Sequence, residues 1–342
     1  MTESNRTEPG AARARPRVVA TARPRVVATA RAFCASDGPH QAILRDAGME
    51  LVLAAGATPR SAPELAALAA DADALLLGLD HCDATVFAAA PRLRVVSRFG
   101  AGVDTVDLEA AERHGVTVTN TPGANTIAVA ELTLGLLLAL ARDLPTSIAT
   151  VRSGGWSRAS GWELDGKTLG LVGLGRIGRA VAVRAAAFGM RVIAHDPYAG
   201  DVPGVERVEL DALWARADAI SLHLGLDDRT RHLVDAAVLA RLKPGAVLLN
   251  TSRGGLVDEA ALADALRSGH LGGAAADAFD REPPVGSPLL DLPNFIPTPH
   301  LGAATREAAR RMGEAAARNV VAVLTGVGDA DVVPGPESGR TA

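Results

Sequence analysis

The sequence predicts an α/β protein in which two doubly wound parallel-sheet domains enclose a cleft, and three observations support this. Short apolar segments alternate with helical segments along most of the 342 residues, which is typical of parallel sheets covered by helices. Hydrophobic residues, mostly Ala, Val and Leu, make up 48% of the chain, and aromatic residues only 3%, as expected for buried aliphatic strands. A chain of this length also has room for two cores.

The first series of elements begins beside a tandem repeat. The octapeptide ARPRVVAT occupies residues 14–21 and again residues 22–29, and only one copy can form the first strand. The second copy runs directly into the next segment, so we assign the strand to residues 25–29 and expect residues 1–22 to form a disordered arm. The elements expected next are helices at 42–47, 62–70 and 84–90, and strands at 51–54, 74–77 and 93–97.

The second series begins with a glycine motif. GLVGLGRIG at residues 170–178 overlaps an apolar run at 169–172 and opens a helical segment at 176–190. A second apolar run at 191–195 follows and ends next to Asp196. Further strands are expected near residues 218–223, 246–250, 273–277 and 295–297.

This order of strand, glycine turn, helix, strand and acid predicts a Rossmann-like dinucleotide-binding unit. Gly173 permits the tight turn, Gly175 lets the backbone approach a pyrophosphate, and Gly178 lets the helix pack on the strand. Asp196 can accept hydrogen bonds from both ribose hydroxyls and would repel a 2′-phosphate, so we predict NAD rather than NADP. The residues predicted to contact the cofactor in this unit are Gly173, Gly175, Arg176, Ile177, Gly178 and Asp196.

The domain organisation depends on the last long amphipathic segment. Residues 305–324 are long enough to cross back and pack on the first unit. The expected substrate domain is therefore discontinuous, with residues 23–119 and 301–326, while the NAD-binding domain spans residues 120–300. The Gly-, Pro- and acid-rich segment 327–342 is expected to be a disordered tail.

Charge and cysteine content exclude several classes of protein. A net charge of −4 spread along the chain gives no basic stripe for nucleic acid. The apolar stretch 127–141 contains Glu131 and is too short to span a bilayer. The two cysteines, Cys34 and Cys82, cannot form a disulfide framework, and no Cys and His spacing resembles a zinc site. We therefore expect a cytoplasmic protein with no metal and no nucleic-acid or membrane partner.

Three ionisable residues follow strands expected in the second domain. Arg253 comes after one such strand, and its guanidinium can bind a carboxylate with two parallel hydrogen bonds. His300 follows the last expected strand and is a natural acid or base near neutral pH. Glu282 lies in the loop after Asp277, where it can bond the imidazole and stabilise its protonated form. Reduction of a ketone by hydride needs such a cation and such a proton donor.

Four motifs together resemble the D-isomer-specific 2-hydroxyacid dehydrogenase family. Their order and spacing are similar to those of the family, and the resemblance covers about residues 25–325. Four motifs in register are far more specific than the glycine motif alone. They are GKTLGLVGLGRIG at 166–178, TSRGGLVDE at 251–259, DAFDREPP at 277–284 and TPHLGAAT at 298–305.

The resemblance implies a role for each motif. It implies that Arg253, Glu282 and His300 are the catalytic residues, and that Thr251 and Asp277 contact the cofactor, Asp277 near its nicotinamide end. It also implies that RFGAGVD at 98–104, after the strand at 93–97, is the substrate loop that receives the substrate carboxylate. Consecutive N–H groups in such a Gly-rich turn can form an anion-binding nest. The predicted substrate-binding residues are Arg98, Ala101, Gly102 and Arg253.

Within the family, GVDTVDLEAA at 102–111 and NTPGAN at 120–125 are similar to sequences of the D-3-phosphoglycerate dehydrogenases. Two departures weaken that substrate assignment. Residues 78–80 read GLD, without the Arg-Ser that many such enzymes use near the substrate phosphate, which leaves Arg98 as the main candidate phosphate ligand. We also expect no C-terminal serine-sensing domain and therefore no serine feedback through such a domain.

Three hypotheses about function follow. The first is an NAD-dependent oxidoreductase that interconverts a D-2-hydroxy acid and its 2-oxo acid, with 3-phosphoglycerate as the first substrate to consider. The second keeps this chemistry but reduces hydroxypyruvate or glyoxylate. The third, from a different class, is a non-catalytic NAD(H)-sensing protein similar to the corepressors of the same broad family. A homodimer formed through the apolar helix at 127–142 is a further expectation from the resemblance.

Overall fold

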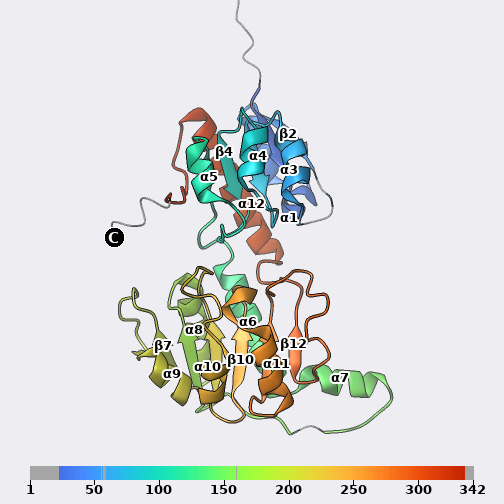
Figure 1. Ribbon diagram of the computed structural model, residues 1–342, viewed down its shortest axis with the longest axis vertical. Helices are drawn as coiled ribbons and strands as arrows, with labels where there is room; N and C mark the ends of the chain where they lie inside the picture. Colours follow the sequence, from blue (N-terminus) through green and yellow to red (C-terminus); the bar gives the residue numbers. More distant parts are fainter. Residues whose placement is uncertain (1–22, 55, 57–58, 159, 336–342) are drawn as a thin grey trace, which may run out of the picture.

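The structure is a computed structural model that describes residues 23–54, 56, 59–158 and 160–335. Within these residues the chain forms two all-parallel sheets, and buried apolar clusters cover both faces of each sheet. Figure 1 shows one sheet in each of two lobes. The expected α/β fold with two doubly wound domains is therefore confirmed. The arm predicted for residues 1–22 lies outside the described residues.

The first sheet contains five strands in the order β2-β1-β3-β4-β5. Its central strand β3 has the sequence Ala-Leu-Leu-Leu and is completely buried, because helices cover both faces of a parallel sheet. The strands are β1 (Arg25–Ala28), β2 (Glu50–Leu53), β3 (Ala74–Leu77), β4 (Val95–Arg98) and β5 (Thr117–Thr119), and the helices are α1 (Arg31–Cys34), α2 (Pro39–Asp46), α3 (Ala62–Ala69), α4 (Ala84–Ala89) and α5 (Leu108–Arg113).

The second sheet contains seven parallel strands in the order β12-β11-β10-β9-β6-β7-β8, so the order of the strands reverses at β6, with β7 and β8 on one side of it and β9 to β12 on the other. Ligands of open parallel sheets bind at such a reversal, outside the carboxyl ends of the strands. The strands are β6 (Thr168–Val172), β7 (Arg191–His195), β8 (Val205–Arg207), β9 (Ala219–Leu222), β10 (Val247–Asn250), β11 (Gly273–Ala276) and β12 (Phe295–Pro297). The helices are α7 (Leu144–Arg152), α8 (Arg176–Ala187), α9 (Leu210–Arg216), α10 (Ala236–Arg241), η1 (Gly254–Leu256) and α11 (Glu259–Arg267).

Two long helices cross between the lobes. α6 (Thr126–Ala141) leaves the first lobe and packs against α8 and the second sheet. α12 (Arg306–Thr325) returns to the first lobe, where it packs on β4 and α2 (Figure 1). The Ser97 hydroxyl of β4 donates to the carbonyl oxygen of Ala316, 3.1 Å away, which fixes the returning helix on the sheet. The first lobe is thus built from two stretches that are far apart in the sequence.

The segment after α12 departs from the expected disorder. The Val333 N–H donates to the carbonyl oxygen of Val118 at 2.8 Å, and Asn120 N–H donates to the carbonyl oxygen of Asp331 at 3.1 Å. The disordered tail predicted for residues 327–342 is therefore not observed at 331–333, and residues 336–342 lie outside the described residues. The physical reason is that β5 is an edge strand, whose unpaired N–H and C=O groups bind a passing segment.

Candidate active site

The glycine turn after β6 is shaped by two close backbone approaches. Gly173 has a φ of +98°, and a Cβ at this position would overlap the carbonyl oxygen of His223, so glycine is required. A Cβ at Gly178 would overlap the carbonyl oxygen of Gly173, so α8 can start this close to β6 only with glycine there. Gly175 is exposed, and its Cβ would meet no atom within 4 Å. The turn is therefore open to a ligand at the N-terminus of α8, where helical N–H groups lack partners.

Asp196 lies beside this turn at the end of β7. Its carboxylate accepts hydrogen bonds from the backbone N–H groups of Leu174, Tyr198 and Ala199, at 2.8, 2.9 and 3.0 Å. Burial alone would raise the pKa of Asp196, but these three bonds hold it below its usual value. The site therefore presents a fixed negative charge at neutral pH, next to the place where the turn is open.

The other residues predicted to contact the cofactor surround the same turn. Arg176 is exposed at the start of α8, and its side chain passes over Gly123. Ile177 is half-buried and packs on the core of the second domain. Thr251 is buried at the end of β10, where its hydroxyl lies 2.9 Å from that of Thr133. Their contact with a cofactor stays a prediction.

Arg253 is held by its neighbours in a rigid turn after β10. The side chain of Asn250 donates to the carbonyl oxygen of Arg253 at 2.7 Å and accepts the Ser252 N–H at 3.1 Å. Gly254 packs so tightly against the backbone of Phe279 that a Cβ would overlap it. The turn that carries Arg253 is thereby fixed against the segment that leads to Glu282.

Arg253 reaches across to the first domain. The Nε atom of Arg253 donates a hydrogen bond to one carboxylate oxygen of Asp104 at 2.8 Å. The Nη2 atom of Arg253 forms an ion pair with the same oxygen at 2.7 Å. The guanidinium lies against Gly102, where a Cβ would overlap Nη2. Burial alone would raise the pKa of Asp104, but the bond and charge of Arg253 lower it. The substrate loop and Arg253, from different domains, therefore meet.

His300 and Glu282 form a second pair. The Nδ1 atom of the imidazole lies 2.9 and 3.0 Å from the two carboxylate oxygens of Glu282, which also accepts the Phe279 N–H at 3.2 Å. Burial would raise the pKa of Glu282, but the bond and charge of His300, with the attraction of Arg253, lower it. The carboxylate thus fixes Nδ1 as the protonated nitrogen, and the Nε2 atom has no partner among the described residues.

A buried carboxylate fixes the turn on which His300 stands. Asp277 accepts hydrogen bonds from the Thr298 hydroxyl and the Leu301 N–H, both at 2.6 Å, and from the Gly302 N–H at 2.7 Å. His300 itself has a φ of +54°, a conformation that non-glycine residues rarely adopt and that occurs preferentially at functional sites. Asp277 therefore anchors the imidazole, and its predicted proximity to the nicotinamide stays a prediction.

The predicted substrate loop has the features of an anion nest. The backbone N–H groups of Ala101 and Gly102 have no hydrogen-bond acceptor in the described part of the chain, while the carbonyl oxygen of Ala101 accepts the Asn120 amide at 2.7 Å. Arg98 is buried and donates through Nη1 to the carbonyl oxygen of Phe99 at 2.7 Å. Burial, and then repulsion by Arg253, lower the pKa of Arg98 to about 10, so it stays charged at neutral pH.

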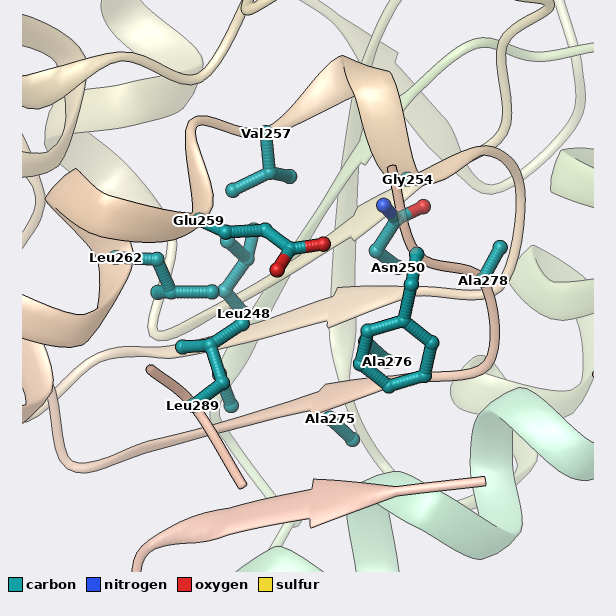
Figure 2. A pocket seen from close by; sticks show the side chains of 12 residues that line it. Leu248, Asn250, Gly254, Val257, Glu259, Leu262, Ala275, Ala276, Ala278 and Leu289 are labelled. Atoms are coloured by element: carbon teal, nitrogen blue, oxygen red, sulfur yellow. The ribbon is translucent and has the colours of Figure 1, made fainter. Parts of the chain in front are cut away.

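A small, mostly apolar cavity lies beside the segment that carries Glu282 (Figure 2). Figure 2 shows the carboxylate of Glu259 pointing along this cavity toward the side of Gly254. Glu259 accepts the Asp280 N–H at 3.0 Å and the Ser287 hydroxyl at 2.6 Å. The cavity belongs to the core, and Glu259 fixes the loop on both sides of Glu282.

Comparison with known proteins assigns this arrangement to a family. A family model described as "D-isomer specific 2-hydroxyacid dehydrogenase, NAD binding domain" matches residues 134–302. These residues include the glycine turn and all three predicted catalytic residues. The chain belongs to the D-isomer-specific 2-hydroxyacid dehydrogenase family. The matched residues lie in the second domain, where the NAD-binding domain was expected.

Individual relatives agree with this assignment. The D-3-phosphoglycerate dehydrogenase of Mycobacterium tuberculosis is 48% identical over 270 residues, which cover 77% of this chain and 51% of the relative. The chain therefore spans about half the length of the curated relatives it matches. Among solved structures, the TT0316 protein from Thermus thermophilus superposes with a TM-score of 0.84 at 43% identity, covering 91% of this chain and 100% of the other. A glyoxylate reductase from Paecilomyes thermophila gives 0.79 at 28% identity, covering 93% and 100%.

The negative charge of Asp196 is expected to make the protein prefer NAD to NADP, and a substitution can test this. Replacing Asp196 with alanine is expected to raise the ratio of NADP to NAD efficiency at least about tenfold, because contact between like charges costs several kcal/mol. The ratio of kcat/KM for the two reduced cofactors measures this. Asp201→Ala, which removes an exposed carboxylate from the following loop, is the matched control and should leave the ratio unchanged. An unchanged ratio in Asp196→Ala would exclude the proposed role.

Several residues of this candidate site could not be recognised from the sequence. Asp104 stood inside the predicted substrate loop, but nothing in the local sequence shows that it pairs with Arg253 of the other domain. Asp80 and Arg60 were not recognised as a buried pair after β3, since they are distant in the sequence. The signal that could have found Asp80 is a carboxylate directly after a wholly apolar strand, at the sheet edge where ligands bind.

Proposed function

We propose that this protein is an NAD-dependent oxidoreductase that interconverts a D-2-hydroxy acid and its 2-oxo acid. The observation that carries the proposal is the pairing of His300 with Glu282 beside Arg253, at the carboxyl edge of the NAD-binding sheet. The imidazole has one nitrogen fixed by a carboxylate and the other free of partners among the described residues, which is the arrangement that a general acid or base requires.

The residues of this chain have two roles: some bind and stabilise negative charge on the substrate, and His300 transfers a proton. Arg253, with the free N–H groups of Ala101 and Gly102, binds the substrate carboxylate and stabilises negative charge near the carbonyl. His300 gives the proton on Nε2 to the carbonyl oxygen during reduction and removes it from the hydroxyl during oxidation. Glu282 stabilises the imidazolium in the first case and keeps the ring oriented in both.

The cofactor site fits a dinucleotide. The open side of Gly175, the first N–H groups of α8, which lack partners among the described residues, and the charged Asp196 match a pyrophosphate and a ribose without a 2′-phosphate. When bound, the nicotinamide would donate the hydride to C2 of the substrate during reduction and accept it from C2 during oxidation. The residues that would hold it are those of the glycine turn with Thr251 and Asp277.

The two candidate substrate classes differ at the end of the molecule remote from the carboxylate, where one carries a phosphate and the other does not. The curated relatives named D-3-phosphoglycerate dehydrogenase favour a phosphorylated acid. The similar glyoxylate reductase, and the sequence GLD at residues 78–80, favour an unphosphorylated one. Steady-state oxidation of NADH with hydroxypyruvate, glyoxylate, pyruvate, 2-oxoglutarate and phosphohydroxypyruvate tests the proposed chemistry. Turnover of at least one is expected, and turnover of none would reject it.

We also propose a homodimer, but not through the helix first expected. α6 buries most of its apolar side chains against its own domain, whereas α7 buries none and projects from the second lobe (Figure 1). Leu144, Ile148 and Val151, spaced along one face of α7, remain 43, 48 and 54% exposed. Sedimentation should give the mass of two 35.0 kDa chains, and Ile148→Glu should shift the mass toward one. A wild-type mass of one chain would contradict the dimer.

A further inference from the structure

A buried ion pair stands next to the substrate loop. Asp80, which follows β3, is fully buried. Its carboxylate accepts a hydrogen bond from the backbone N–H of Arg60 at 2.8 Å and forms an ion pair with the Arg60 guanidinium at 3.5 Å. The hydroxyl of Thr29, which follows β1, also donates to Asp80. The charge of Arg60 is thereby matched before any substrate arrives. The ion pair is made by Nη1, which is buried and makes no hydrogen bond in the part of the chain that the structure describes, whereas Nη2 donates to the carbonyl oxygen of Ala54.

This pair lies at the carboxyl edge of the first sheet, on the side of the substrate loop. β3 and β4 are neighbours, with Leu77 opposite Arg98, so Asp80 follows a strand adjacent to the one that ends in Arg98. The Cys82 N–H donates to the carbonyl oxygen of Thr105 at 2.9 Å, which ties the Asp80 segment to the end of the substrate loop. Arg98 interacts electrostatically with Asp80, Asp104 and Arg253.

The charges of this region nearly cancel. Three guanidinium groups, those of Arg60, Arg98 and Arg253, face two carboxylates, those of Asp80 and Asp104, which leaves one positive charge. The Glu282–His300 pair adds no net charge when the imidazole is protonated, which is the form that reduction of a 2-oxo acid requires. A 2-oxo acid with a single carboxylate neutralises this charge. A phosphate on its far end would add about 1.5 to 2 negative charges at pH 7, beside a buried carboxylate.

We propose that the Asp80–Arg60 pair restricts the substrate to 2-oxo and 2-hydroxy acids with one negative charge and rejects phosphorylated ones. This rests on the proposed dehydrogenase function and specifies the substrate class of the same site. Asp80 acts as a specificity-determining residue, because it neutralises the nearby arginine that a phosphate would need and repels the phosphate itself.

The test compares hydroxypyruvate with phosphohydroxypyruvate, which differ only in the distal phosphate. The wild type is expected to prefer hydroxypyruvate by at least about tenfold in kcat/KM. Asp80→Asn frees Arg60 and removes one negative charge, so it should shift the ratio at least about tenfold toward phosphohydroxypyruvate, mostly through KM, since a tenfold change corresponds to about 1.4 kcal/mol.

A matched control exists at the other end of the same strand. Asp73 precedes β3, accepts the Arg25 N–H at 2.7 Å and pairs with Arg92 at 2.6 Å, as Asp80 does with Arg60. Asp73→Asn should leave the substrate ratio unchanged. If Asp80→Asn does not fold, inhibition of the wild-type protein tests the proposal instead. D-glycerate should inhibit hydroxypyruvate reduction more strongly than 3-phosphoglycerate does.

The outcomes separate this inference from the proposed function. Wild-type preference for phosphohydroxypyruvate, or stronger inhibition by 3-phosphoglycerate, would overturn the role of Asp80 while leaving the dehydrogenase function intact. An unchanged ratio in a folded Asp80→Asn variant would overturn it as well. Absence of turnover with every 2-oxo acid would instead reject the proposed function on which the inference rests.

Discussion

Replacing His300 with alanine is expected to lower kcat for 2-oxo acid reduction by about 10²- to 10⁴-fold, the usual contribution of a positioned general acid. The imidazole is bonded through Nδ1 to Glu282, whose charge Arg253 attracts, and its Nε2 has no partner among the described residues. NADH affinity, measured by fluorescence titration, should be unchanged, because the glycine turn and Asp196 are untouched. Loss of turnover with intact NADH binding therefore separates chemistry from folding.

The control for this variant is another histidine with the same backbone conformation. His232 has a φ of +50° and His300 a φ of +54°, so alanine has the same backbone penalty at both positions. His232 is exposed, and its side chain takes no part in the site. His232→Ala should keep the wild-type kcat. A kcat for His300→Ala within about threefold of the wild type would remove His300 from the mechanism.

Removing the guanidinium of Arg253 is expected to have the second-largest effect. Arg253→Ala should lower kcat/KM by about 10²- to 10³-fold, because loss of a hydrogen-bonded charge at its partner costs about 2–5 kcal/mol. Arg253→Lys should recover only part of this loss. A lysine cannot donate to Asp104 and to the carbonyl oxygen of Ser252 at once while offering a flat edge to a carboxylate.

The matched control for Arg253 is Arg231. Its guanidinium forms an ion pair with exposed Asp280 at 3.4 Å. It also lies close to Gly255, which follows Arg253 closely in the sequence. Arg231→Ala removes a cation from the same region without removing a proposed substrate contact, so kcat/KM should stay near the wild-type value. If Arg253→Ala changed kcat/KM no more than Arg231→Ala does, carboxylate binding by Arg253 would be contradicted.

Most of the fold could be predicted because buried parallel strands leave a strong local signal. The wholly apolar segment that became β3 and the run before the glycine turn were found at their observed positions. Shorter elements were missed. β8 is a three-residue edge strand with mostly exposed side chains, and α7 buries none of its residues, so neither shows the periodicity of an element packed on a core.

The candidate site was predictable where the chemistry is local. His300 and Glu282 were expected to bond because each follows a neighbouring strand of one sheet, and they do. The Arg253–Asp104 contact depends on how the two domains are placed, which no pattern within either domain encodes. The same holds for Asp80 and Arg60, which only the folded chain brings together.

The most direct test of the central claim is the transfer of deuterium to a 2-oxo acid from NADH in which both hydrogens at C4 are replaced by deuterium. With hydroxypyruvate, the account predicts D-glycerate carrying one deuterium at C2, identified by chiral chromatography and mass spectrometry. NADH bound at micromolar Kd without label in any hydroxy acid would contradict it and would favour a protein that senses NAD(H) without catalysis.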